Sequence, residues 1–163
     1  MASRAAKSGD AFHIEKKMEE KYDKEEAAGT PQRIIAWMTA VLGNDVPAPA
    51  GNSYDKIHLW LKDGVVLGRF INKLLEADGK PKVGVKAKAT QTFAAMNNLE
   101  NFNAGCRAYG VAETALFQTT DCFEGRKGPM LNVINCLNQL GFTANEKGFK
   151  PAYEAIESPK ADY

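Results

Sequence analysis

The stretch that decides the fold runs from residue 59 to residue 74 and reads LWLKDGVVLGRFINKL. From residue 65 to residue 75, apolar residues recur at helical spacing for more than three turns. A buried strand would explain residues 65–67, but not a pattern of this length. Asp63 and Gly64 suit the turn before such a helix, because Asp caps helices and Gly is conformationally permissive. The stretch therefore predicts a short helix, a turn and a broad-faced, buried helix.

The same spacing predicts further helices on both sides of this stretch. We expect them at 10–28, from Pro31 to Gly43, at 54–61, from Thr90 to Gly110 and from Gly128 to Gly141, with a helical turn around Phe123. The sequence shows no alternating strand pattern, no repeat and no low-complexity tract. It therefore predicts an all-α fold with one domain at 10–142, a flexible N-terminus at 1–9 and a loosely attached tail at 143–163.

Large side chains on the inner faces of these segments form the expected core. They are Trp37, Trp60, Phe70, Leu74, Phe102, Tyr109, Phe123 and Leu137. The pattern also places Phe93 inward. The first segment differs, because its apolar residues Ile14, Met18 and Tyr22 make one narrow stripe on a charged helix. We interpret it as an outer cover of the domain.

The composition is that of one globular domain rather than a nucleic-acid or membrane protein. The chain has 163 residues, 44% hydrophobic and 25% charged, which suffices for a core without disulfides. Its 21 Lys and Arg nearly balance 20 Asp and Glu, so bulk charge gives no reason to expect nucleic-acid binding. No apolar run approaches the ~20 residues that cross a bilayer, and the N-terminus lacks a signal core. The sequence predicts no membrane partner and a cytoplasmic location.

Residue types that carry catalysis or bind metals are sparse and scattered. The chain has three cysteines, Cys106, Cys122 and Cys136, and two histidines, His13 and His58. The cysteines form no C-x-x-C pair, and neither histidine has a partner at ligand or triad spacing. Cys106 and Cys136 fall in apolar helical patterns typical of buried thiols. We predict no enzyme activity, no metal site and no cofactor.

Lysines supply the remaining candidate sites. The densest basic group is Lys80, Lys82, Lys86 and Lys88, in a segment that reads as a loop. A solvated loop and a partner-binding surface explain it equally well. The charged first helix likewise covers the domain or presents lysines to an acidic partner.

Four blocks of the sequence resemble calponin-homology domains. Residues 59–74 are similar to that family's Leu-Lys-Asp-Gly-Val-x-Leu…Asn-Lys-Leu core, and Ile35–Met38 to its Trp-Ile helix. Residues 93–102 resemble Phe-x-x-Met-Glu-Asn-Ile-x-x-Phe, and 109–124 resemble Tyr-Gly-Val…Phe-x-Thr-x-Asp-Leu-Phe-Glu. Residues 17–23, which end in Lys-Tyr-Asp, are similar to the lead-in helix of calponin and transgelin, a muscle-protein branch. The resemblance covers about residues 11–142.

The resemblance implies a compact bundle of four main helices plus shorter ones, and a role on the actin cytoskeleton. The implied partner is F-actin, and the implied function of this cytoskeleton-associated protein is to bind or bundle filaments or to regulate actomyosin. By analogy, the binding surfaces are the first helix (Lys17, Lys21, Lys24) and the outer side of the last helix (Lys127, Asn132, Asn135). The basic loop is the rival surface.

A second hypothesis remains open, because the chain holds one copy of a domain that other actin binders use in tandem. It also lacks the C-terminal Gly-x-Ser/Ala-Gln-x-Gly-Met repeat that is linked to filament binding in calponin and transgelin. On this hypothesis the protein is an adaptor whose lone domain binds a signalling kinase, a small GTPase or tubulin.

Overall fold

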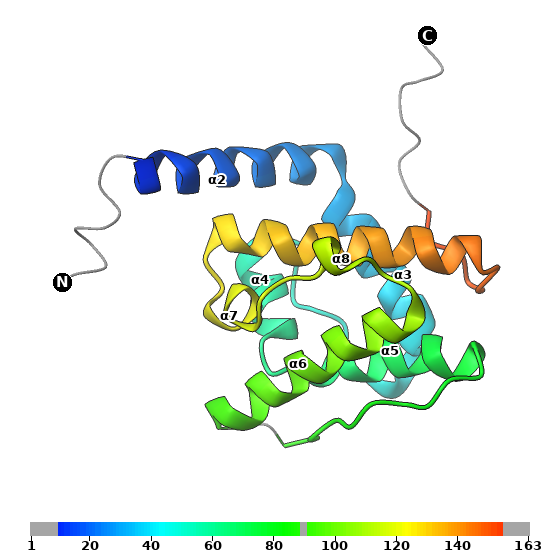
Figure 1. Cartoon of the computed structure of the whole chain (residues 1–163). Coiled ribbons are helices and arrows are strands. Elements are labelled where there is room, and N and C mark those ends of the chain that lie inside the picture. Colours follow the sequence, from blue (N-terminus) through cyan, green and yellow to red (C-terminus); the bar gives the residue numbers. More distant parts are fainter. Residues whose placement is uncertain (1–9, 89–90, 155–163) are drawn as a thin grey trace, which may run out of the picture.

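Seven α-helices and two short 3-10 turns account for most of residues 10–88 and 91–154, the part of the chain that the computed structural model describes (Figure 1). The helices are α2 (Asp10–Ala28), α3 (Thr30–Leu42), α4 (Tyr54–Leu61), α5 (Val65–Ala77), α6 (Thr92–Tyr109), α7 (Thr119–Glu124) and α8 (Lys127–Glu146). The turns are η1 (Gly43–Asp45) and η2 (Glu113–Ala115). No strand occurs in these residues, and the all-α prediction is confirmed.

Helix α8 lies in the middle of the bundle and contacts α2, α3, α4 and α7 (Figure 1). Its buried residues cover most of the helix surface, and one side, with Asn135, Gln139 and Phe142, stays exposed. The buried residues are Gly128, Met130, Leu131, Val133, Ile134, Cys136, Leu137, Leu140, Gly141 and Ala144. Helix α2 packs along one side of α8, while α5 and α6 form a second pair below it. The core therefore lies between α8 and the α5–α6 pair, closed on one side by α3.

Six of the eight expected core side chains are buried, namely Trp37, Phe70, Leu74, Phe102, Tyr109 and Leu137. The other two, Trp60 and Phe123, are half-buried at the edge of the core, which corrects their assignment to its interior. Their helices, α4 and α7, are short outer helices. The Trp60 indole N–H donates to the carbonyl of Pro47 at 2.8 Å, and the Lys62 ammonium lies 5.4 Å from the Phe123 ring.

Phe93 also differs from its expected place. The expected cap of its helix, Thr90, lies outside the described residues, and α6 begins at Thr92. Phe93 is therefore in the first turn and is 75% exposed. The Lys86 ammonium lies 5.5 Å from its ring, so the residue belongs to the surface.

The C-terminal part of the chain is packed further than expected. Helix α8 continues past Gly141 to Glu146, and the segment after it returns to the bundle, where Tyr153 is only 3% exposed. The Trp37 indole N–H donates to the Pro151 carbonyl at 2.9 Å. The expectation of a loosely attached tail is therefore wrong for residues 143–154. The rest of that tail, and the N-terminus at 1–9, lie outside the described residues.

We expect Phe102→Ala and Trp37→Ala each to lower the free energy of unfolding by about 3–5 kcal/mol, because each leaves a cavity in the core. Phe93→Ala, in the same helix as Phe102, should change it by less than about 0.5 kcal/mol because its ring is exposed. Urea unfolding followed by circular dichroism measures all three. A Phe93 variant as unstable as the Phe102 variant would contradict these placements.

Candidate functional site

Helix α2 presents one face to α8 and the opposite face to solvent. Tyr22 is fully buried and Met18 half-buried, whereas Ile14 is 60% exposed. The Tyr22 ring packs edge-on against Tyr54, with 6.1 Å between ring centroids. The apolar stripe therefore holds α2 to the bundle through its C-terminal half.

The lysines of α2 lie on its outer face. Lys17, Lys21 and Lys24 recur at i, i+4 and i+7, which places them on one side of the helix. All three are exposed, and among the described residues none has an ion-pair partner. Lys16, which our sequence analysis did not select, is exposed on a neighbouring face. These side chains are therefore available to a partner.

Three acidic residues of α2 make contacts outside the helix. Asp23 pairs with Lys127 of α8 at 2.5 Å, and Glu15 pairs with Arg126 just before that helix. Glu25 accepts a hydrogen bond from the Thr30 hydroxyl at 2.7 Å. Helix α2 contains more acidic than basic residues, and two of its carboxylates pair with basic residues at the start of α8. Its outer face carries the exposed Lys17, Lys21 and Lys24 together with the exposed Glu20.

The expected outer side of α8 is mostly occupied by contacts within the protein. Besides pairing with Asp23, the Lys127 ammonium lies 5.7 Å from the Tyr54 ring, and the hydrogen bond to Asp23 raises the pKa of Lys127. The Asn132 amide donates to Asp121 at 3.2 Å. Of the three residues selected on α8, Asn135 is the one that is fully exposed.

Two asparagine side chains hold the basic loop in an extended course along the bundle. The Asn72 amide exchanges two hydrogen bonds with the backbone of Val83, at 2.7 and 2.9 Å. The Asn98 amide does the same with Lys86, at 2.8 and 3.0 Å, and also donates to the carbonyl of Asp63 at 3.0 Å. Sequence reasoning missed this role, because a single asparagine on a helix carries no signal of the loop it will meet.

The turn before α5 brings Asn98 into position. Gly64 has a φ of +76°, and a Cβ added to it would lie 2.5 Å from the Cβ of Asn98. The Asp63 carboxylate accepts a hydrogen bond from the Val65 amide at 3.0 Å. A residue without a side chain and with a left-handed backbone is therefore needed here, in agreement with a structural role for Asp63-Gly64.

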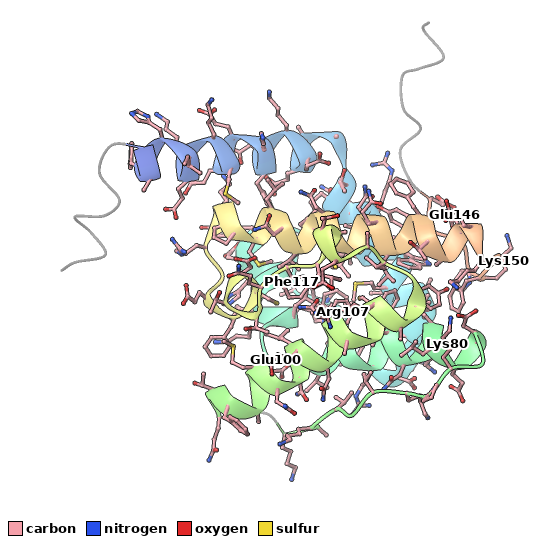
Figure 2. All side chains as sticks on the ribbon, viewed as in Figure 1. Lys80, Glu100, Arg107, Phe117, Glu146 and Lys150 are labelled. Atoms are coloured by element: carbon pink, nitrogen blue, oxygen red, sulfur yellow. The ribbon has the colours of Figure 1, made fainter. Side chains whose placement is uncertain are left out.

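Lys80 differs from the other lysines of the loop. Its ammonium lies 2.6 Å from the Asp78 carboxylate, which Lys147 also reaches at 3.2 Å. The hydrogen bonds from Lys80 and then Lys147 lower the pKa of Asp78. The C-terminal ends of α5, α6 and α8 meet at this side of the molecule, where Figure 2 labels Lys80 and Lys150. Because helix C-termini carry negative partial charge, we assign Lys80 and Lys147 to stabilising these ends.

Lys82, Lys86 and Lys88 are exposed and form the remaining basic surface of the loop. This loop runs along the side of the bundle opposite α2 (Figure 1). The structure therefore does not gather the selected residues into one site. It separates them into the α2 lysine face (Lys17, Lys21 and Lys24) and the loop surface (Lys82, Lys86 and Lys88).

His58 and the three cysteines have structural contacts within the bundle. His58 Nε2 lies 2.8 Å from the Phe123 carbonyl, and all three cysteines are buried. Burial raises the pKa of the Cys106 and Cys122 thiols, which disfavours their reactive thiolate form. Within residues 10–88 and 91–154, no cluster of three His, Cys, Asp or Glu side chains is placed to bind a metal ion. In the same residues, no helix has both the length and the apolar character of a membrane span.

Comparisons with known proteins agree with this architecture. The family model described as the calponin homology (CH) domain matches residues 29–145. Among solved structures, the calponin-homology domain of Rng2 from Schizosaccharomyces pombe is similar, with a TM-score of 0.57. The two share 23% sequence identity, over 82% of this chain and 80% of that chain. At this identity the likeness concerns the fold. The family match begins at Gly29, so α2 precedes it.

We expect Asn98→Ala to destabilise the domain by about 1–3 kcal/mol, because it leaves buried backbone groups without hydrogen-bond partners. The Lys86 amide should exchange its hydrogen faster, since its acceptor is removed. Asn97→Ala is the matched control, because the neighbouring Asn97 makes no hydrogen bond through its side chain within the described structure. Hydrogen exchange by NMR measures both variants, and unchanged exchange at Lys86 in the Asn98 variant would refute the clamp.

Proposed function

This chain belongs to the calponin-homology domain family, and on that premise we propose that it binds actin filaments through the α2 lysine face. Membership of the family indicates cytoskeletal binding in general. The similarity of residues 17–23 to the lead-in helix of calponin and transgelin supports a place in that branch. A cytoplasmic, cytoskeleton-associated location follows from the same proposal.

The observation that carries the proposal is the division of charge across α2. Its acidic side chains Glu15 and Asp23 pair with basic residues of the bundle, while Lys17, Lys21 and Lys24 stay exposed on the opposite face. A protein with a net charge of +1 thereby presents three unpaired lysines on one side of a helix, with Glu20 as the exposed carboxylate among them. Such a surface is complementary to an acidic filament.

The mechanism is charge-complementary docking with a rigid helix. Tyr22 and the two ion pairs fix α2 on the bundle, so the lysines are presented in a constant arrangement. Exposed charges act over about 8 Å at physiological ionic strength, and this range lengthens as salt is removed. Binding should therefore weaken with rising salt. Asn135 of α8 is exposed and would contribute at the edge of the contact, whereas Lys127 and Asn132 act through their contacts within the protein.

We expect the triple variant Lys17→Glu, Lys21→Glu and Lys24→Glu to bind actin filaments at least about tenfold more weakly, a loss of about 1.4 kcal/mol. The domain should remain folded, because exposed charges contribute only about 0–1 kcal/mol each to stability. Co-sedimentation with filaments at low and physiological salt measures the effect, and circular dichroism checks the fold.

The matched control reverses the loop surface, with Lys82→Glu, Lys86→Glu and Lys88→Glu, which changes the net charge by the same amount. Lys80 is left intact because it pairs with Asp78. Loss of binding in the loop variant but not in the α2 variant would refute the assignment of the surface. A wild-type protein that never pellets with actin would refute the actin proposal itself. An adaptor for a kinase, a small GTPase or tubulin would then be the better hypothesis.

A further inference from the structure

The segment that follows α8 lies across the bundle as a strap, which we define as residues 148–154. The chain leaves α8 at Glu146 and turns at Gly148, whose φ is +78° and whose Cβ position is open. The strap then returns along α3 and α8 in a non-helical course. It comes after the last helix of the described chain, so none of the helices depends on it for a covalent connection.

Tyr153 is the residue that anchors the strap. Its ring is 3% exposed and lies 5.2 Å from the Trp37 ring and 6.1 Å from the Phe142 ring, measured between centroids. A Cβ added to Gly141 would come within 2.2 Å of the Tyr153 ring. The ring therefore fills a slot on the surface of α8 that exists because residue 141 has no side chain.

Polar groups around this slot bind the strap as they would bind an extended peptide. The Asn145 amide donates to the Tyr153 carbonyl at 2.7 Å and accepts from the Tyr153 N–H at 2.9 Å. The Trp37 indole N–H donates to the Pro151 carbonyl, and the Tyr153 hydroxyl donates to Asn138. Burial raises the pKa of Tyr153 to about 12, so this hydroxyl keeps its proton. The site thus recognises two backbone positions and a phenol two residues after a proline.

Beside the slot, the strap leaves space unfilled. A groove of about 210 Å³ lies between the strap and α3. It is lined by four residues of α3 and three of the strap, namely Arg33, Ala36, Trp37, Ala40, Pro151, Ala152 and Glu154. Ala152 is the residue between Pro151 and Tyr153, and its methyl group is too small to occupy such a volume. In the strap, Tyr153 therefore fills its slot and the backbone forms its hydrogen bonds, but the groove stays unfilled.

We propose that the strap is an intramolecular ligand, and that its site also accepts a Pro-x-Tyr segment of a partner protein, with a bulkier apolar residue at x. Such a segment would make the same hydrogen bonds as the strap and would fill the groove as well. Release of residues 150–154 requires the opening of four side-chain hydrogen bonds and one aromatic slot, with every helix and Phe149 left in place. The apparent affinity of the partner is then its intrinsic affinity multiplied by the fraction of molecules in which the strap is open.

The first test uses the protein of residues 1–163 and a fluorescent peptide of residues 148–154, with fluorescence anisotropy as the readout. We expect the Tyr153→Ala protein, whose slot is empty, to bind this peptide at least tenfold more tightly than the wild type does. A peptide that carries Ala152→Leu should bind more tightly still, and one that carries Tyr153→Ala should not bind. In the Tyr153→Ala protein, a further Gly141→Ala change should abolish binding, because its methyl group occupies the slot.

A folded Tyr153→Ala protein that binds the peptide no better than the wild type, or binds both tyrosine and alanine peptides equally, overturns the proposal.

The second test needs no variant. In the wild type, the Tyr153 amide should exchange its hydrogen at least tenfold faster than the slowest amides of α8, because it opens locally. Exchange of Tyr153 at the rate of those slowest amides would mean that the strap opens only on global unfolding, and this also overturns the proposal.

Discussion

The burial of α8 on most of its sides is the constraint on which the rest of the structure depends. Helices α2, α3, α4 and α7 each contact it, and α3, α4 and α7 in turn contact the α5–α6 pair. Both ends of the described chain contribute a buried tyrosine: Tyr22 from α2, which packs on α8, and Tyr153 from the strap on Gly141. With α2 seated in this way, its opposite face must be open to solvent.

The distribution of charge on the surface of α2 follows from its packing on α8. The start of α8 is basic, with Lys127 preceded by Arg126, and it pairs with Asp23 and Glu15 of α2. The outer face of α2 keeps Lys17, Lys21 and Lys24 unpaired, with Glu20 exposed among them, although the helix as a whole is acidic. The basic loop is governed differently, because Asn72 and Asn98 fix its backbone on the opposite side of the bundle. One chain of almost neutral net charge therefore has two separate positive surfaces, of which we assign the first to filament binding.

Local spacing sufficed to predict the helices and the Asp63-Gly64 turn, because both depend on residues close together in the chain. It also predicted that Lys17, Lys21 and Lys24 face solvent, since they lie beside the narrow apolar stripe and not in it. Local spacing does not reveal whether another element packs over a given helix face. For this reason the prediction that Phe93 points inward was wrong. Local spacing also could not predict that Asn98 binds the loop backbone or that Tyr153 anchors the strap. Each residue contacts a segment whose path is set by tertiary packing, and the strap has no helical or strand periodicity.

The central claim, that the α2 lysine face contacts the filament, is tested most directly by lysine footprinting. The wild-type protein would be acetylated with and without actin filaments, and the modified lysines quantified by mass spectrometry. The account predicts that Lys17, Lys21 and Lys24 are protected in the filament-bound protein, while Lys82, Lys86 and Lys88 react as in the free protein. Protection of the loop lysines with unchanged reactivity on α2 would contradict it.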